Sequence, residues 1–131
     1  MWNILFAVPL LMHGLAHISG FLASWTSLDV GYADHPWLFS QGVFLQSLTG
    51  RIFGLLWLIA MLGLAGSALG LVFRQGWWPA LAVVATVLSL VVILPWWNTV
   101  PPGAKLGVVF NLLVLATLLT PLQRRLFELL G

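Results

Sequence analysis

Four long apolar stretches occupy most of this 131-residue chain and limit what it can fold into. They run over residues 3–23, 52–73, 77–97 and 104–120. An α-helix needs about 20 apolar residues to cross a hydrocarbon layer about 30 Å thick. Barrel strands span about 10 residues and alternate with polar positions, whereas these stretches are continuously apolar. We therefore expect an all-α polytopic membrane protein, a four-transmembrane-helix bundle in which residues 1–131 form a single domain.

The composition indicates the same class of protein. Hydrophobic residues make up 61% of the chain and charged residues 6%, and the mean hydropathy is +1.07. A soluble domain of this size does not need so apolar a balance for its core. The high isoelectric point comes from five basic against three acidic side chains and does not indicate nucleic acid as a partner. Since the chain has no cysteine, disulfides, thiolate ligands and covalently attached haem are excluded.

Basic residues and tryptophans near the ends of the stretches predict the topology, because an excess of Lys and Arg marks the cytoplasmic side. One side collects Arg74, Arg124 and Arg125 with the N-terminus, and the other has Arg51 and Lys105. We expect both termini in the cytoplasm. Tryptophans favour membrane interfaces, and all but Trp57 fall near the ends of the stretches: Trp2, Trp25, Trp37, Trp77, Trp78, Trp96 and Trp97.

The longest connection covers residues 24–50 and would lie on the outer side. Its second half, residues 37–46, mixes apolar with uncharged polar residues. This composition suits a short interfacial helix or a cap over the mouth of the bundle. A plain surface lid with no further role fits equally well.

Two histidines in the first stretch, His13 and His17, are the main functional clue. Their spacing places both on one helical face, which should point into the bundle because a polar side chain facing lipid has no partner. Counting about 1.5 Å per residue from the outer end places His17, Ser89 and Asn111 in one layer. His13 and Thr86 fall about one turn deeper. We expect these five residues to form a polar cluster.

The cluster has two interpretations. It could be a hydrogen-bonded pin that fixes the register of the helices, with both histidines neutral. It could instead bind a ligand, with Arg51 and Lys105 closing its outer mouth. Interhelical hydrogen bonds contribute only about 0.6 kcal/mol on average, so two histidines exceed what register alone requires.

A metal site is not predicted, although histidines four residues apart can share a metal. Further ligands would have to come from the long connection, which offers Asp29, Asp34 and His35. These would need to reach His13 and His17 inside the bundle. The number of ligands excludes a multi-histidine di-iron site.

The cofactor stays open. Bis-histidine haem needs imidazoles from two facing helices, and only the first stretch carries any. A pigment or five-coordinate haem needs one axial histidine. A quinone needs only hydrogen-bond donors such as His17, Asn111 or Arg51. The alternatives are therefore no cofactor, an apolar ligand, a quinone or a pigment.

Small residues recur at a spacing of four, as expected where membrane helices pack closely. The second stretch has Gly63 with Ser67 and Gly66 with Gly70, and the fourth region has Gly103, Gly107 and Asn111. Such faces also suit association with other membrane subunits or a second copy.

Three segments, LMHGLAHISGF at 11–21, GLLW at 54–57 and KLGVVFN at 105–111, together carry a resemblance. The chain resembles small bacterial four-helix membrane proteins with an HGxxHxxGF-like first helix, some of them described as DoxX-like. The resemblance covers all four stretches. It implies a location in the bacterial inner membrane and no defined activity. Residues 98–102 depart from it, because they lack the acidic residue expected shortly before the Lys.

These features predict a small non-catalytic membrane protein that is an accessory subunit of an assembly or holds an apolar ligand in the outer half of the bundle. The alternative is a cofactor-, quinone- or pigment-binding protein that uses His13, His17 and Asn111. A small transporter or proton relay is less favoured, because the stretches contain no acidic residue. The expected partners are the lipid bilayer and other membrane subunits or a second copy, and not nucleic acid.

Overall fold

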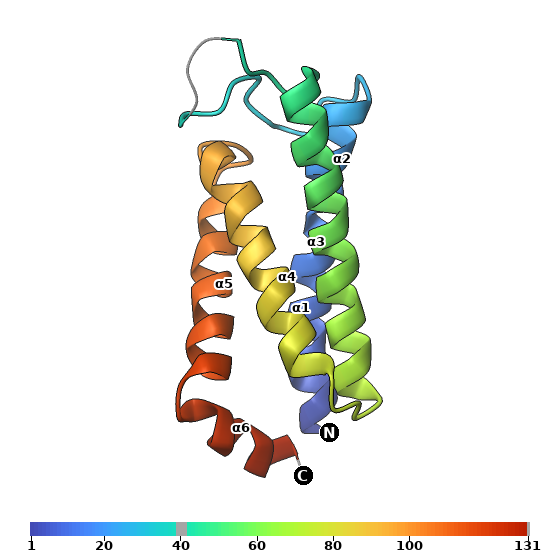
Figure 1. Ribbon diagram of the computed structural model, residues 1–131, viewed down its shortest axis with the longest axis vertical. Coiled ribbons are helices and arrows are strands. Elements are labelled where there is room, and N and C mark those ends of the chain that lie inside the picture. The colour runs from blue at the N-terminus through green and yellow to red at the C-terminus, as the bar shows by residue number, and fades with distance from the viewer. Residues whose placement is uncertain (39–41, 131) are drawn as a thin grey trace.

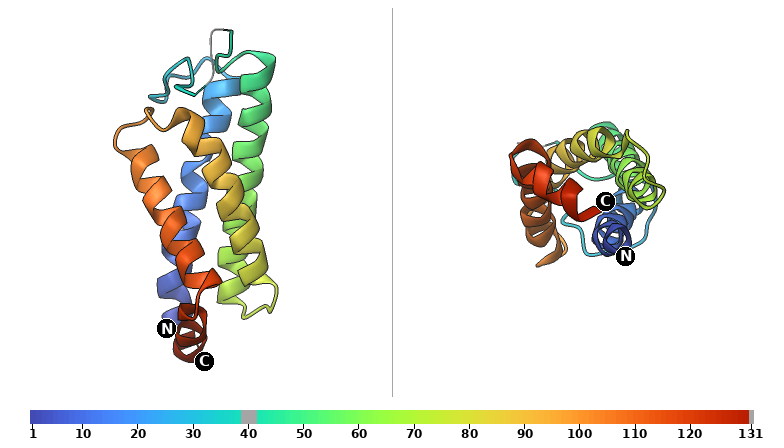
Figure 2. Two further views of the ribbon diagram at one scale, coloured as in Figure 1. Left: turned by 60° about the vertical axis from the view of Figure 1, so that its left-hand side comes forward. Right: turned by 90° about the horizontal axis from the view of Figure 1, so that it is seen from below.

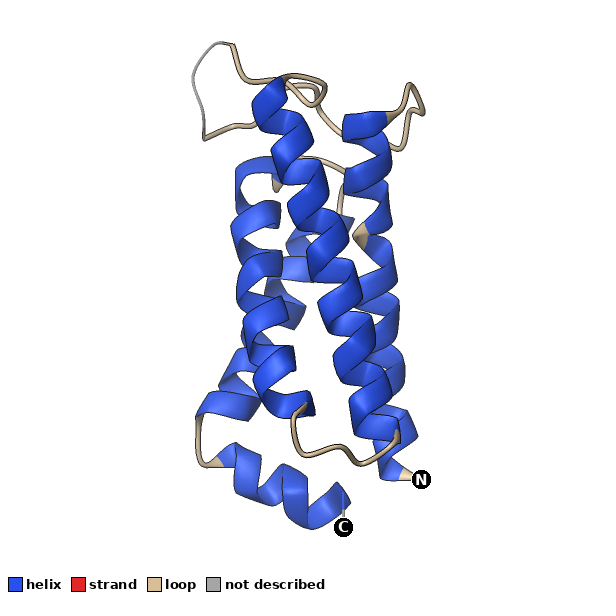
Figure 3. Cartoon of the chain, turned by 45° about the vertical axis from the view of Figure 1, so that its right-hand side comes forward, coloured by secondary structure: helices blue, strands red, loops and turns tan. Residues whose placement is uncertain are grey.

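The computed structural model describes residues 1–38 and 42–130, and within these ranges the chain is helical and has no strand (Figure 3). The prediction of an all-α fold is confirmed. The elements, in chain order, are α1 (Trp2–Ala16), α2 (Ile18–Trp25), α3 (Leu48–Val72), α4 (Trp78–Ile93), the 3₁₀ turn η1 (Leu94–Trp96), α5 (Gly103–Leu119) and α6 (Leu122–Leu130).

The helices lie lengthwise in an elongated bundle, and α6 lies across one end of it (Figures 1 and 2). Both termini and the turn between α3 and α4 are at that end, which we name the terminal end. The connection between α2 and α3 lies at the opposite end, the loop end. Three segments are long and apolar enough to cross a membrane: α1 with α2, α3, and α4 with η1. A fourth is added if α5 and α6, which meet at 87°, count as one bent span.

The observed elements follow the predicted stretches closely, except at the long connection and at α6. α2 continues to Trp25 and α3 begins at Leu48, so this connection covers residues 26–47 instead of 24–50. Ser47 starts α3, because its extended backbone and its Oγ, which accepts the N–H of Gly50, cap the helix. Residues 42–47 are not helical. Of the interfacial helix expected over 37–46, residues 39–41 lie outside the described residues.

The first span is divided at His17. Pro9 lies inside α1 without ending it, and the helix instead tightens where His17 donates to the carbonyl of Gly14 and accepts from the N–H of Gly20. These hydrogen bonds span three residues, as in a 3₁₀ turn. The junction places His17 between α1 and α2.

α6 lies outside all predicted stretches, because its four polar residues interrupt any apolar run: Gln123, Arg124, Arg125 and Glu128. Its apolar face packs on the terminal end of the bundle. Leu126 is buried there, and the ring of Phe127 lies 6.2 Å from that of Trp78. An amphipathic helix of this kind buries one face and leaves the charged face free.

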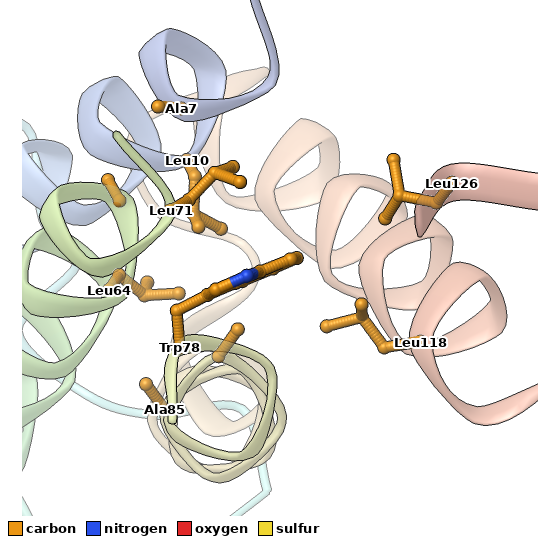
Figure 4. Close-up of a cluster of buried hydrophobic side chains, with 10 residues drawn as sticks. Ala7, Leu10, Leu64, Leu71, Trp78, Ala85, Leu118 and Leu126 are labelled. Atoms are coloured by element: carbon orange, nitrogen blue, oxygen red, sulfur yellow. The ribbon is translucent and has the colours of Figure 1, made fainter. Parts of the chain in front are cut away.

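Two apolar clusters form the core. In the cluster toward the terminal end, Trp78 extends into the centre with Leu64 on one side and Leu118 on the other (Figure 4). Trp78 is thus buried in the core. The second cluster, toward the loop end, is built around Trp57 and Trp96. The predicted polar residues of α1, α4 and α5 lie between the two.

A glycine on α3 allows a close contact with α4. A Cβ added to Gly63 would lie 2.8 Å from the Cβ of Ala85. At Gly66, on the same helix, an added Cβ would meet only the flexible end of Leu81, at 3.3 Å. The two positions share a helix and a partner helix but differ in available space.

We predict that Gly63→Ala destabilises the protein by about 1–3 kcal/mol, because the two helices must separate to admit the methyl group. Gly66→Ala is the matched control and should change stability little. Unfolding of both variants by a denaturing detergent measures the difference. Equal stability of the two variants would show that the close packing at Gly63 is not needed.

Candidate functional site

The hydroxyl of Ser89 on α4 is the centre of a polar cluster that joins three segments of the bundle. His17 Nε2 and Asn111 Nδ2 each lie 2.7 Å from Ser89 Oγ, and His13 Nε2 lies 3.3 Å from it. Ser89 and Asn111 are fully buried. The structure therefore brings together four of the five residues predicted as a cluster.

A backbone carbonyl determines the proton positions at His17. Nδ1 of His17 lies 2.9 Å from the carbonyl oxygen of His13, which can only accept, so Nδ1 carries a proton. In a neutral imidazole the other nitrogen then accepts. Ser89 must therefore donate its hydroxyl proton to Nε2 of His17.

The proton positions at His17 and Ser89 in turn determine the orientation of the Asn111 amide and the proton position at His13. Since the proton of Ser89 is used, Asn111 donates from Nδ2 to Ser89 Oγ. Oδ1 of Asn111 accepts from His13 Nε2, 2.9 Å away. The two histidines are thus opposite tautomers. In its neutral form His13 has an unprotonated Nδ1, and no hydrogen bond within residues 1–38 and 42–130 engages that atom.

A glycine on α5 leaves room for the His13 ring to reach Asn111. A Cβ on Gly107 would lie 3.1 Å from Cε1 of His13. One turn further along, the ring of Phe110 lies 4.7 Å from that of His13. The predicted small face of α5 is therefore the face that contacts α1.

Thr86 does not join the cluster. It is buried one turn before Ser89 on α4, but its hydroxyl has no hydrogen-bond partner among the residues that the structure describes. Depth along the helix axes places Thr86 level with His13. The imidazole of His13 is nevertheless long enough to reach Ser89, one turn away from Thr86. Backbone depth therefore does not predict which side chains meet.

Arg51 and Lys105 do not close a mouth over the cluster. The guanidinium of Arg51 lies over the ring of Trp25, 5.6 Å from its centroid, and Nζ of Lys105 lies 5.7 Å from that of Trp97. Both residues are exposed, and neither lines the cavity described next. A cation over an aromatic ring is attracted to the electron-rich face of that ring.

A cavity of about 110 Å³ adjoins the cluster on its loop side. Small residues on α1 and α5 leave this space, and the loop residue Tyr32 and two tryptophans form other walls. The lining consists of His13, Ala16, His17, Ser19, Tyr32, Trp57, Ile93, Trp96, Thr99, Val100, Gly103, Ala104 and Gly107.

Three aromatic walls of the cavity were not predicted as site residues. The ring of Trp57 lies 5.3 Å from the rings of both Tyr32 and Trp96. Trp57 is the tryptophan that falls well inside an apolar stretch. This position is the sequence signal that could have marked it as a site residue. Trp96 is only 1% exposed, and its Nε1 has no hydrogen-bond partner in the described part of the chain. Burial raises the pKa of the Tyr32 phenol, which therefore stays a neutral hydroxyl.

The third metal ligand suggested for His13 and His17 is not brought to them. Nδ1 of His35 lies 2.9 Å from the carbonyl oxygen of Val43 within the long connection. In residues 1–38 and 42–130, no group of three or more His, Cys, Asp or Glu side chains is placed to hold a metal ion.

Ser89 and His17 are hydrogen-bonded as a serine nucleophile and its general base are in a hydrolase. Unlike that nucleophile, the Ser89 hydroxyl is not accessible to a substrate. Ser89 is fully buried and is not among the residues that line the cavity. A substrate in the cavity would not reach its hydroxyl, although nucleophilic catalysis requires that contact. The pair therefore acts as part of the scaffold.

The chain matches no family model, no curated protein and no solved structure. The resemblance carried by residues 11–21, 54–57 and 105–111 stays a prediction. Function has to be inferred from the site itself.

We predict that Ser89→Ala destabilises the protein by about 1–3 kcal/mol, because His17 and Asn111 each lose a buried partner. Thr86→Val, one turn away and equally buried, removes a hydroxyl without a partner and should be neutral or stabilising. Thermal unfolding of both variants in detergent checks the prediction. If Thr86→Val were the more damaging change, Ser89 would not be the centre of the cluster.

Proposed function

We propose that the protein is a bacterial inner-membrane protein that holds a small ligand, without catalysis, in the cavity beside His13. The outward surface of the helices supports a membrane location. Leu62 and Leu69 on α3 and Leu112 and Leu113 on α5 are each more than half exposed. Large exposed apolar surfaces of this kind require a covering of lipid or protein.

The arrangement of charges supports an orientation with the terminal end in the cytoplasm. α6 with Arg124 and Arg125 and the turn that contains Arg74 lie at the same end as the N-terminus (Figure 1). Basic residues near the ends of spans favour the cytoplasmic side. The amphipathic α6 would lie at the inner interface with its charged face toward water.

One observation favours ligand binding over a purely structural pin: a cavity adjoins the cluster, and a polar atom on a residue of its wall lacks a partner. A structural pin needs only its own hydrogen bonds, and the cluster around Ser89 satisfies these internally. His13 Nδ1, on a residue that lines the cavity, has no partner among the described residues. A bound molecule that donates a hydrogen bond would give this acceptor its partner.

An accessory-subunit role is the second candidate, and a different feature favours it. An apolar groove of about 240 Å³ lies toward the terminal end, with Leu10 of α1 and Leu113 of α5 among its walls. In a larger assembly, a helix of another subunit would pack closely in this groove.

We predict that the protein, extracted from its own membranes in mild detergent, carries extra mass from a bound small molecule in native mass spectrometry. Ala104→Leu, which places a larger side chain in the cavity wall, should abolish that mass. Ala116→Leu is the matched control, because Ala116 is exposed on the same helix and lines no described cavity. It should retain the bound molecule.

The same spectra separate the candidates. Bound mass that persists in Ala104→Leu, or no bound mass in the unaltered protein, contradicts ligand holding in this cavity. A complex with other polypeptides and no small molecule would instead establish the accessory subunit.

A further inference from the structure

Arg74, in the turn between α3 and α4, has a backbone conformation that favours glycine, with a φ of 54°. The hydrogen bonds around it are those of a Schellman motif at the end of a helix. The N–H of Arg74 donates to the carbonyl of Leu71 at 3.2 Å, and the N–H of Gln75 donates to that of Gly70 at 2.8 Å. A Cβ at the left-handed position of this motif costs stability, so glycine is usual there. The chain thus carries an arginine where its backbone alone would favour glycine.

A buried amide holds the guanidinium of this arginine. Asn3, in the first turn of α1, is only 8% exposed. With its amide oriented so that both ends are paired, Asn3 accepts from Nε of Arg74 at 3.2 Å and donates to the carbonyl of Leu130 on α6 at 3.3 Å. The two terminal nitrogens of Arg74 have no partner within residues 1–38 and 42–130. Their N–H groups are therefore free to donate to a ligand.

Asn3 and Arg74 both line a pocket of about 260 Å³ at the terminal end of the bundle. Residues of α6 and of the turn between α3 and α4 form most of its walls (Figure 1). The walls are largely apolar and include Trp78 and Phe127, whose rings lie 6.2 Å apart. Among the described residues of the lining, Arg74 is the one charged side chain, and there is no Asp or Glu. The pocket therefore combines an unpaired cation with a hydrocarbon surface.

The position of the pocket indicates where its ligand comes from. Phe73 and Trp77 lie on either side of the Arg74 turn and are each more than half exposed. Exposed aromatic side chains at the end of a membrane span favour the interface, the level at which lipid headgroups lie. A guanidinium matches the geometry of a phosphate and can donate two parallel hydrogen bonds to it. A phospholipid offers both a phosphate and hydrocarbon at this level.

We infer that this pocket binds an anionic phospholipid, with the guanidinium of Arg74 on the phosphate and the apolar walls against the hydrocarbon. The inference rests on the membrane location proposed above and is independent of the ligand in the cavity beside His13. A zwitterionic lipid would bring an ammonium group, for which the described lining offers no carboxylate, so an anionic lipid is preferred. A free phosphate would gain nothing from the apolar walls.

Two lipids with the same acyl chains test the charge of the ligand: dimyristoyl phosphatidylglycerol and dimyristoyl phosphatidylcholine. Each is titrated into the whole protein in mild detergent, and native mass spectrometry measures the bound lipid. Phosphatidylglycerol should bind about tenfold more tightly, because it has no ammonium group that must lose its hydration. Inorganic phosphate at the same concentration should not displace it, since phosphate lacks acyl chains. Equal affinity of the two lipids, or displacement by inorganic phosphate, overturns the inference.

Arg74→Gly removes the guanidinium and supplies the residue that the left-handed backbone favours, so the variant should stay folded. Its affinity for phosphatidylglycerol should fall about tenfold, as expected for the loss of a charge-assisted contact. Arg124→Gln is the matched control, because it removes one charge at the same end from an exposed residue that does not line the pocket. It should keep the preference for the anionic lipid.

Thermal unfolding in detergent checks that both variants are folded. If Arg74→Gly keeps the preference, or if Arg124→Gln loses it to the same extent, the preference belongs to the charge of the whole terminal end and the inference is wrong. Should Arg74→Gly not fold, the comparison of the two lipids and inorganic phosphate on the unaltered protein still decides.

Failure of this lipid site and failure of the proposed function give different results. Ala104→Leu, which fills the cavity beside His13, should leave the preference for phosphatidylglycerol unchanged, because Ala104 does not line the pocket of Arg74. If Ala104→Leu abolishes that preference, the lipid binds in the cavity and the inference is wrong. If the protein shows no preference between the lipids but carries a molecule that Ala104→Leu removes, the lipid site is wrong and ligand holding stands.

Discussion

The carbonyl oxygen of His13 accepts a hydrogen bond from Nδ1 of His17, and the polar centre of the bundle depends on this one contact. It leaves Nε2 of His17 as an acceptor, which takes the proton of Ser89, and Ser89 in turn accepts from Asn111. α1, α4 and α5 are thereby joined at one level. The apolar side chains around them offer these groups no other partner, so each bond that is lost leaves a buried polar atom unpaired.

The polar cluster also separates two open spaces between α1 and α5. There His13 of α1 meets Gly107 and Phe110 of α5. On the loop side the small residues Ala16 and Ala104 leave the polar-edged cavity, and on the terminal side larger apolar residues border the wider groove. α5 otherwise packs mainly on α4 and α6. A short polar contact thus fixes the position of α5 while leaving space on both sides, and the space on the loop side is where we place the ligand.

The sequence predicts the helices and most of the cluster, because both depend on local regularities. Apolar runs specify the long helices, and counting along them places His17, Ser89 and Asn111 in one layer with His13 about one turn deeper. The prediction fails where the outcome depends on the reach of a side chain or on distant packing. Thr86 has a suitable depth but no partner, and Arg51 packs on Trp25 near the end of α2. The walls formed by Tyr32 and Trp96 depend on how the chain returns to the bundle, which periodicity does not encode. α6 does carry its leucines at helical spacing, but a search for continuous apolar runs does not use that signal.

The measurement that tests this account most directly is solid-state NMR of the ¹⁵N-histidine-labelled protein in lipid bilayers, with the imidazole signals assigned through His13→Gln and His17→Gln variants. The account predicts two neutral histidines in opposite tautomers. His17 should carry its proton on Nδ1, and His13 should carry its proton on Nε2 and leave Nδ1 bare. The same tautomer at both positions, or a proton on both nitrogens of either ring, would contradict the hydrogen-bond assignment from which the cluster is derived.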